Sequence, residues 1–310
     1  MNETIDISVE FAGLKLANPV FTASGTCGYA DELADFININ SLGGFITKSI
    51  TLKPRKGNPP QRAVETDSGM LNAIGLANIG VDSFIAEKIP LLEKLTVPVF
   101  VNVAGATIDE YVRVVERLAG QKAVAGFELN ISCPNVSKGG ITFGTDPMQV
   151  SEITSAVKKA AADKILMVKL SPCVTDISVT ARAAVEAGAN ALSLVNTFTA
   201  MVIDIETAKP VLANRTGGLS GPAIKPMAVY LVNKVYNDVA RAANIPIVGL
   251  GGIRTASDAL EFIIAGASAV SVGTATFVDP TCTIKIIEGI KKYCARKNKS
   301  VREIIGSLQT

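Results

Sequence analysis

Short apolar runs, many of them rich in valine and isoleucine, alternate along this chain with longer stretches in which apolar residues recur at helical spacing. The first pattern is typical of buried parallel strands, and the second is typical of amphipathic helices. The runs occur at residues 20–24, 44–49, 97–103, 126–131, 165–170, 191–196, 246–250 and 269–273. Eight strand–helix units within 310 residues predict a (β/α)8 TIM barrel, which is an α/β fold.

The stretches with helical periodicity follow these strands, at residues 31–39, 81–95, 108–119, 147–162, 176–187, 223–243, 256–265 and 281–297. Residues 5–16 alternate around Gly13 and predict an N-terminal hairpin that could close the bottom of the barrel. Long rim loops are expected after strands 2, 4 and 6, at residues 50–80, 134–147 and 197–222, and loops of such length usually cover a ligand. No linker divides the chain, so one domain is expected over residues 1–310.

Polar side chains stand at the ends of six predicted strands. In chain order they are Ser24, Lys48, Asn102, Asn130, Lys169 and Asn196. Side chains at the C-terminal ends of barrel strands converge on the active site. Each residue alone could be structural, but the set is hard to explain by packing. With two cations and no strand-end carboxylate, this ring is predicted to bind an electron-rich, partly anionic ligand.

Glycines mark the ends of the last two predicted strands. Gly251 and Gly252 follow the seventh, and Gly273 and Thr274 follow the eighth. Glycine is the default residue of a strand–helix turn, so simple turn chemistry is one interpretation. Barrels of this class commonly hold a phosphate at the same two loops, where backbone N–H groups can approach it. The two glycine sites together favour the phosphate.

The chain contains no histidine, the usual proton-transfer group near neutral pH. A cysteine, lysine, carboxylate or tyrosine must therefore perform any such chemistry. Cys133 is the best placed, because the strand at 126–131 breaks at Pro134 and leaves Cys133 in the loop after it. A small buried residue is the commoner role of a free cysteine. We expect that role for the other four cysteines, Cys27, Cys173, Cys282 and Cys294.

Composition narrows the class of protein. Thirty basic and 28 acidic side chains give a formal charge of +2, which is too small to indicate a nucleic-acid partner. The five cysteines contain no CxxC pair, so neither a disulfide framework nor a metal or iron–sulfur site is expected on this chain. The N-terminal residues show no signal-peptide pattern, and no apolar run reaches membrane-spanning length. A cytoplasmic protein without membrane partners is expected.

Seven longer motifs occur along the chain, at 23–26 (ASGT), 47–54 (TKSITLKP), 69–76 (GMLNAIGL), 130–135 (NISCPN), 168–172 (VKLSP), 217–226 (GGLSGPAIKP) and 249–253 (GLGGI). They resemble those of the class 1B dihydroorotate dehydrogenase catalytic subunits, which are flavin enzymes of pyrimidine synthesis. Their order and spacing match the family between about residue 5 and residue 280, so the resemblance covers nearly the whole chain.

The resemblance implies one FMN per chain, stacked over the barrel mouth, and oxidation of (S)-dihydroorotate to orotate. It places FMN on Ser24, Lys48, Ser49, Asn102, Asn130, Lys169, Val195, Gly221, Gly251, Gly252, Gly273 and Thr274. It places the substrate on Lys48, Asn72, Ala73, Ile74, Gly75, Leu76, Asn130, Asn196 and Thr197. Cys133 becomes the base that takes the C5 proton while hydride passes from C6 to flavin N5.

The same resemblance implies a homodimer flanked by electron-transfer subunits, a heterotetramer in which the partner carries FAD and a 2Fe-2S cluster and reduces NAD. This chain has neither a cluster-like cysteine spacing nor a dinucleotide fingerprint at a strand–helix junction. Three alternatives remain open: a class 1A-like, fumarate-linked enzyme; an FMN-dependent dihydropyrimidine dehydrogenase; and a non-catalytic barrel that binds a phosphate ligand.

The chain departs from the family pattern at a few positions. Ala77 and Ile79 stand where the family usually has glutamine and proline, and Cys27, Cys173 and Ala200 are also unusual. Ala77 and Ala200 lie in loops expected on the substrate side. The departures therefore bear on substrate affinity and loop motion more than on flavin binding.

Overall fold

Eight parallel strands form a closed barrel in this computed structural model, which describes residues 5–131 and 143–309. Seven neighbouring pairs are hydrogen-bonded in the order β3-β16-β15-β10-β9-β8-β7-β4, and a parallel bridge between Phe21 and Gly44 joins the two ends. The strands are β3 (Val20–Thr22), β4 (Phe45–Ile46), β7 (Val99–Val103), β8 (Val124–Asn130), β9 (Ile165–Lys169), β10 (Ala191–Leu194), β15 (Ile247–Leu250) and β16 (Ala269–Val272). The predicted (β/α)8 fold is confirmed.

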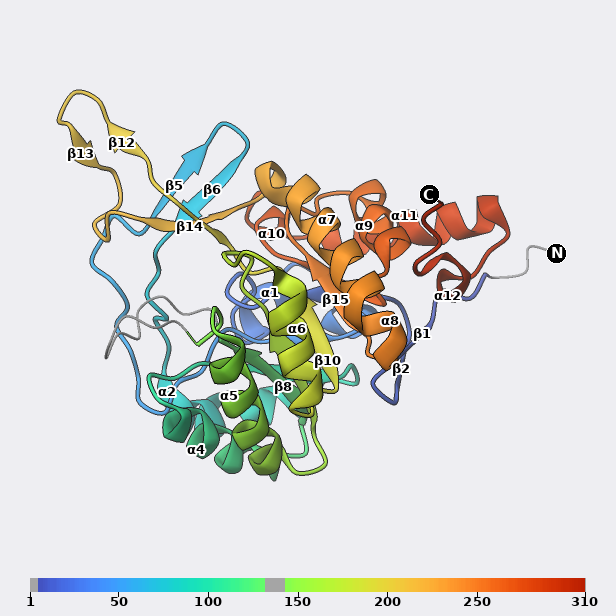
Figure 1. Cartoon of the computed structure of the whole chain (residues 1–310), viewed down its shortest axis with the longest axis horizontal. Coiled ribbons are helices and arrows are strands. Elements are labelled where there is room, and N and C mark those ends of the chain that lie inside the picture. The colour runs from blue at the N-terminus through green and yellow to red at the C-terminus, as the bar shows by residue number, and fades with distance from the viewer. Residues whose placement is uncertain (1–4, 132–142, 310) are drawn as a thin grey trace.

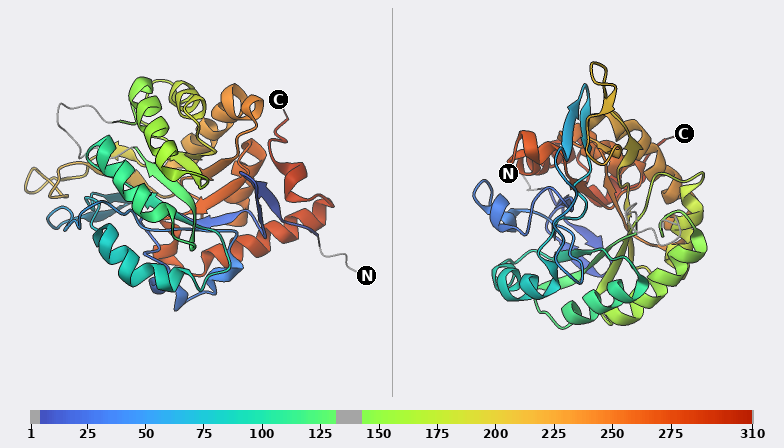
Figure 2. Two further views of the ribbon diagram at one scale, coloured as in Figure 1. Left: turned by 90° about the horizontal axis from the view of Figure 1, so that it is seen from below. Right: turned by 90° about the vertical axis from the view of Figure 1, so that its left-hand side faces the viewer.

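Helices surround this barrel (Figures 1 and 2). The main ones are α4 (Ile108–Ala119), α5 (Pro147–Ala161), α6 (Ile177–Glu186), α7 (Lys225–Val235), α9 (Ala256–Ala265) and α11 (Cys282–Lys297). Side-chain oxygens of Thr107, Asp146, Asp176 and Thr255 cap the first turns of α4, α5, α6 and α9 by accepting hydrogen bonds from backbone N–H groups there. No helix of the described ranges is long and apolar enough to cross a membrane.

Shorter helical segments complete the ring. Residues 80–92 run through α2 (Gly80–Ser83), the π-helical turn η2 (Phe84–Lys88) and α3 (Ile89–Leu92), and α7 continues through η4 (Tyr236–Ala240) into α8 (Arg241–Ala243). The others are α1 (Asp31–Ala34), η1 (Ile39–Ser41), η3 (Pro222–Ile224), α10 (Ala275–Val278) and α12 (Val301–Ile304). The predicted helix at 31–39 is therefore too long: Asn38 takes an extended conformation and caps η1 instead.

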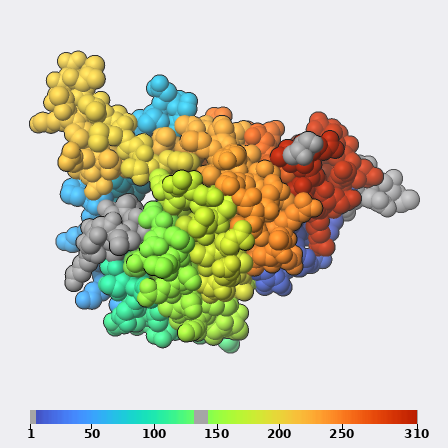
Figure 3. Space-filling model, viewed as in Figure 1, coloured from blue at the N-terminus to red at the C-terminus, as the bar shows by residue number. Residues whose placement is uncertain are grey.

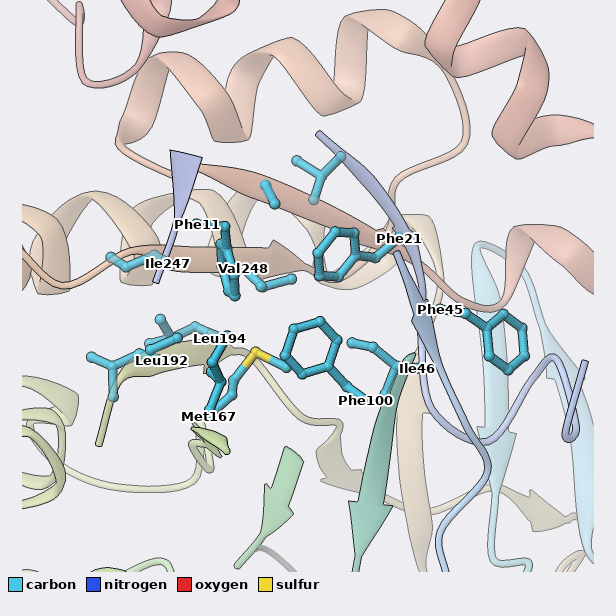
Figure 4. Packing of buried hydrophobic residues seen from close by; sticks show 14 of the residues in the cluster. Phe11, Phe21, Phe45, Ile46, Phe100, Met167, Leu192, Leu194, Ile247 and Val248 are labelled. Atoms are coloured by element: carbon cyan, nitrogen blue, oxygen red, sulfur yellow. The ribbon is translucent and has the colours of Figure 1, made fainter. Parts of the chain in front are cut away.

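The N-terminal hairpin closes the bottom of the barrel, as predicted. It consists of β1 (Val9–Phe11) and β2 (Leu14–Leu16), paired antiparallel. Its Phe11 makes edge contacts with Phe21 at 5.6 Å and Phe100 at 6.1 Å between ring centroids, and these two rings stack on each other at 5.8 Å. Figure 4 shows the three rings beside Met167 and Val248 in the buried core. The apolar core therefore fills the half of the barrel that lies away from the strand ends.

At the opposite end, two of the predicted rim loops form a common sheet. Its strand order is β11-β14-β6-β5, with antiparallel pairing throughout. The strands are β5 (Ala63–Thr66), β6 (Gly69–Asn72), β11 (Phe198–Ala200) and β14 (Gly217–Ser220). A further hairpin, β12 (Ile203–Asp204) with β13 (Lys209–Pro210), extends from β11 and projects from the molecule (Figures 1 and 3). We call the four-stranded element the rim sheet.

Candidate active site

Lys169 crosses the barrel mouth. It is the last residue of β9, the fifth barrel strand, and its Nζ donates to Ser24 Oγ at 2.9 Å. Ser24 follows β3, the first barrel strand, which lies on the opposite side of the ring. Only 4% of Lys169 is exposed. The ammonium group is thus held inside the barrel at the level of the strand ends.

A buried carboxylate lies beneath this lysine. Glu128 in β8 is fully buried, and its Oε2 is 3.6 Å from Lys169 Nζ. The same oxygen accepts from Asn102 Nδ2 at 2.5 Å, and Oε1 accepts from Ser193 Oγ at 2.8 Å. The predicted ring of donors without a strand-end carboxylate was therefore incomplete, because Glu128 lies on the same strand face as Asn130, two residues before the strand end.

Two amides of the predicted ring face each other. Asn196 Nδ2 donates to Asn130 Oδ1 at 3.2 Å, and Tyr111 Oη donates to the Asn130 carbonyl at 2.7 Å. On the other side of Glu128, Ser49 Oγ donates to Asn102 Oδ1 at 2.5 Å. The predicted residues thus fall into two groups at one end of the barrel: Ser24, Lys169, Asn102 and Ser49 are connected through Glu128, and Asn130 contacts Asn196.

Lys48 adds an ammonium group to the polar strand ends. It follows β4, and its backbone N–H donates to the Gly28 carbonyl at 2.8 Å. Its side chain is half-buried, and within the described parts of the chain its ammonium group has no hydrogen bond or ion pair. An anionic ligand could therefore pair with Lys48 without displacing a protein carboxylate.

The glycines at the last strand ends form a backbone cradle. Gly221, Gly251 and Gly252 all have positive φ, at 89°, 129° and 79°. A Cβ on Gly252 would stand 2.7 Å from the Gly221 carbonyl oxygen, and one on Gly273 would stand 3.2 Å from Ala23 Cβ. Loops that are distant in sequence thus approach closely here, and side chains would fill the space.

Free backbone donors in this cradle fit a phosphate. Among the hydrogen bonds found between described residues, none uses the N–H groups of Gly252, Gly273 or Thr274. Thr274 Oγ1 is 2.8 Å from Ser220 Oγ, so a hydroxyl pair borders the same loops. Backbone N–H groups left without protein partners, together with hydroxyls, are typical of anion-binding loops.

The rim sheet brings part of the predicted substrate segment together. Asn72, at the end of β6, donates from Nδ2 to the Gly218 carbonyl at 3.4 Å, and a side chain at Gly218 would collide with Thr197. Thr197 N–H donates to Asn196 Oδ1 at 2.9 Å, so the contacts continue to the strand ends. Asn72, Thr197, Asn196 and Asn130 therefore form one continuous group.

Residues 73–76, the rest of the predicted substrate segment, are less closely connected to the strand ends. Ala73 packs with Leu71 and Leu212 in a small separate apolar cluster. The Ile74 carbonyl accepts from Asn58 N–H at 3.1 Å, and the Leu76 carbonyl accepts from Asn78 Nδ2 at 2.7 Å. In the described ranges, no hydrogen bond links residues 74–76, including Gly75, to the barrel strands.

The predicted catalytic residue Cys133 lies outside the described residues, as does most of the loop predicted at 134–147. Of the other cysteines, Cys27, Cys282 and Cys294 are buried, as predicted, whereas Cys173 is exposed, so the buried role predicted for Cys173 is wrong. Burial raises the pKa of the Cys27 and Cys294 thiols and raises that of Cys282 to about 11. These three thiols are therefore protonated at neutral pH, which agrees with the structural role predicted for them.

Val195, which the family resemblance places against FMN, lies at a strand end. It is buried directly after β10, and its N–H donates to the Leu250 carbonyl at 3.0 Å. Sequence reasoning missed Glu128, Ser220 and Tyr111 as members of the site, and Ser193 as a hydrogen-bond donor to Glu128. A charged residue inside an otherwise apolar strand is the signal that could have identified Glu128, because a buried charge needs partners.

Comparisons with known proteins place this arrangement in a family. The family model described as "Dihydroorotate dehydrogenase" matches residues 6–294. The chain is 53% identical over 306 residues to "Dihydroorotate dehydrogenase B (NAD(+)), catalytic subunit" of Geotalea uraniireducens (strain Rf4), covering 98% of this chain and 99% of that protein. It is also 53% identical over 305 residues to the protein of the same name from Geobacter sp. (strain M21), covering 98% of each.

A solved structure agrees with this family. The chain resembles DHODH from Eimeria tenella, solved in complex with ferulenol, with a TM-score of 0.80 and 25% identity over 99% of this chain and 89% of that one. The match is therefore one of whole fold as well as of sequence. This chain belongs to the dihydroorotate dehydrogenase family.

Proposed function

We propose that this chain is the catalytic subunit of an NAD-linked dihydroorotate dehydrogenase, which oxidises (S)-dihydroorotate to orotate in pyrimidine (UMP) biosynthesis. The observation that carries the proposal is the group of Lys169, Ser24, Asn130 and Asn196 at the barrel mouth, next to a glycine cradle. The relatives' names, "Dihydroorotate dehydrogenase B (NAD(+)), catalytic subunit", support the same activity.

FMN is the cofactor that this family implies, and the residues at the mouth fit it. Its phosphate would lie on Gly221, Gly251, Gly252, Gly273 and Thr274, where backbone N–H groups are available. Its ring and ribityl chain would be bound by Ser24, Lys48, Ser49, Asn102, Asn130, Lys169 and Val195. Bound FMN supplies the acceptor for hydride from C6 of the substrate. A fixed cation such as Lys169 favours the anionic reduced form of a flavin.

The substrate carries a carboxylate and an imide ring, and the site offers a partner for each. We assign the carboxylate to Lys48, whose ammonium group has no partner within the described residues. Donors and acceptors for the imide ring come from Asn72, Asn130, Asn196 and Thr197, which lie in one continuous group. Residues 73–76 follow Asn72 and are proposed to border the ring.

Removing the C5 proton requires a base, and we assign that role to Cys133. The assignment rests on its sequence position three residues after Asn130 and on the absence of histidine. A thiol of ordinary pKa is mostly protonated at pH 7, so the rate of oxidation should increase toward alkaline pH. The proton leaves C5 to the thiolate while the hydride leaves C6, which forms the C5–C6 double bond of orotate.

Electrons must then leave this chain through a partner. The relatives are named catalytic subunits, which implies a second subunit. We propose that the partner carries FAD and a 2Fe-2S cluster and passes the electrons to NAD. A homodimer of this chain flanked by two partners, in the cytoplasm, is the assembly we propose.

An anaerobic absorbance measurement tests cofactor, substrate and half-reaction together. Purified chain should show a flavin band in the visible blue, and dihydroorotate should bleach that band without any partner protein. Colourless protein after reconstitution with FMN would contradict the cofactor assignment. A flavin band that dihydroorotate leaves unchanged, while uracil-type dihydropyrimidines bleach it, would contradict the substrate assignment instead.

A further inference from the structure

Glu128 is the centre of a buried network below the proposed flavin site. One of its oxygens accepts from Asn102, the other accepts from Ser193, and Lys169 Nζ lies 3.6 Å away. Asn102 and Glu128 are direct partners in the pairing of β7 with β8, and Ser193 and Lys169 are partners in the pairing of β10 with β9. The carboxylate therefore contacts side chains from three other barrel strands.

Glu128 is a charged residue in the fully buried interior of the barrel. Glu128, Lys169 and Asp258 are the only charged residues of the described ranges that are buried, and Asp258 lies outside this network, where it caps α9. Burying an ion pair seldom increases stability over an apolar pair of similar size, because both charges lose their hydration. Packing of the barrel interior alone therefore gives no reason for Glu128.

Its contacts suggest two consequences at the mouth. Lys169 would place an uncompensated positive charge below the strand ends, and Glu128 balances that charge. Asn102 donates to Glu128 through Nδ2 and accepts from Ser49 through Oδ1, so the carboxylate also fixes which way the Asn102 amide is turned. Lys169 and Asn102 both belong to the residues proposed to bind FMN.

We propose that Glu128 is a positioning residue that sets the affinity of this site for reduced relative to oxidised FMN, by offsetting the charge of Lys169 and orienting Asn102. The inference rests on the proposed function, since it concerns the same flavin site. A more positive site favours the anionic reduced flavin. Glu128 therefore holds the potential of bound FMN lower than Lys169 alone would set it.

The test is the midpoint potential of FMN bound to the purified chain, measured by equilibration with a reference dye. Glu128→Gln keeps the side-chain shape, can still hydrogen-bond with Ser193 and Asn102, and removes the charge. We expect reduced FMN to gain at least tenfold in affinity over oxidised FMN, which for a two-electron couple raises the potential by about 30 mV. Separate FMN titrations of oxidised and reduced protein should give the same ratio.

Two controls separate charge from disturbance of the fold. Glu152→Gln removes an exposed carboxylate from α5, and Ser193→Ala removes a hydrogen bond to Glu128 but keeps its charge. Both should leave the potential near the wild-type value. A shift in Ser193→Ala as large as that of Glu128→Gln would overturn the proposal, since the effect would then come from repacking.

A second variant keeps the test decisive if Glu128→Gln does not fold. Glu128→Asp retains the charge but withdraws it from Lys169, and a rise of about threefold in the same affinity ratio, roughly 14 mV, is expected. An unchanged potential in the folded variants would overturn the inference. Failure of the wild-type chain to bind FMN at all would instead overturn the proposed function, so the two failures are distinguishable.

Discussion

Asn130 fixes the place at which the chain leaves its fourth barrel strand. Its carbonyl accepts from the fully buried Tyr111, and its side-chain oxygen accepts from Asn196. Cys133 follows three positions later, outside the described residues. The role of Cys133 as the base is therefore tested by replacing that residue.

Cys133→Ala should retain FMN and lose most dihydroorotate oxidation. A positioned base typically contributes about 10²- to 10⁴-fold to a rate, so flavin bleaching by dihydroorotate should slow by that amount. In the wild-type chain the bleaching rate should increase with pH toward about 8.5, the ordinary pKa of a cysteine thiol. Stopped-flow absorbance over a range of pH measures both effects.

Cys173→Ala is the matched control, because Cys173 is exposed and its sulfur makes a weak contact with Thr199 Oγ1 at 3.9 Å. Its bleaching rate and pH profile should equal those of the wild type. If Cys133→Ala bleaches at a near-normal rate, the base must be another residue, and the pH profile would then report that group.

For single residues, the sequence predicted where a side chain lies in the barrel better than it predicted which side chains it contacts. Lys169 and Asn130 could be placed at the rim because each is the last residue but one of a predicted apolar run, and they end β9 and β8 in the structure. The role of Glu128 could not be predicted, because its partners Asn102 and Ser193 lie 26 and 65 positions away, and only the closed barrel brings them together. Pairing of that kind depends on strand register, which the sequence does not state.

Among the elements, the loop after β15 should be the most sensitive part of the proposed phosphate site. Gly252 has φ of +79°, and a Cβ there would lie 2.7 Å from the Gly221 carbonyl oxygen. Gly252→Ala should therefore distort the cradle and lower FMN affinity at least tenfold while the barrel still folds. FMN titration followed by fluorescence quenching, with circular dichroism of the apoprotein, measures the two effects.

Gly120→Ala is the control for this substitution. Gly120 ends α4 with φ of −76°, and a Cβ there would meet no atom within 4 Å. It should bind FMN as the wild type does. Full FMN retention by Gly252→Ala would instead show that the phosphate lies elsewhere.

Helix α9 begins at a second charged cluster. Asp258 accepts from Thr255 in a capping box and pairs with Lys225 Nζ at 2.7 Å. Burial acts to raise the pKa of the Asp258 carboxyl, but hydrogen bonds from Lys225, Arg254 N–H and Thr255 outweigh it, so the net pKa lies below 3.8. The folded state thus favours the carboxylate.

Asp258→Asn should lower the free energy of unfolding by about 1 kcal/mol at pH 7, a typical value for a lost cap interaction. Because the folded pKa lies below the unfolded one, the stabilisation is complete above about pH 4 and is lost as pH falls through the folded pKa. The difference from wild type should therefore shrink at pH 3. Urea unfolding of the apoprotein at pH 7, 5 and 3 tests this. Asp163→Asn, which alters an exposed carboxylate, should show no such trend.

The barrel strands could be predicted from the sequence, whereas the strands of the rim sheet could not. Each barrel strand is buried and continuous, so its apolar run is visible locally. In the rim sheet, β6 pairs with β14, where Asn72 contacts a residue 146 positions away, and the strands are short, partly buried and rich in glycine. Such strands lack a local signal, and they form because two long loops meet above the barrel.

The whole molecule has two different ends. The Phe11 hairpin closes one end with apolar contacts, whereas the other end gathers the polar strand ends beneath the rim sheet (Figures 1 and 4). Electrons taken from a substrate at the polar end therefore start on the side of the barrel opposite the Phe11 hairpin.

The purified chain, without a partner, should transfer electrons from dihydroorotate to an artificial dye but reduce NAD at no measurable rate. The physical reason is that hydride delivered to FMN at the mouth needs a relay to reach a dinucleotide, and we assign that relay to the partner's FAD and 2Fe-2S cluster. Steady-state assays with dye, NAD and fumarate, at equal enzyme and dihydroorotate concentrations, measure the three acceptors. Fumarate should be reduced far more slowly than the dye. Rapid fumarate reduction by the lone chain would mean that the enzyme is class 1A-like, and NAD reduction by the lone chain would remove the need for a partner.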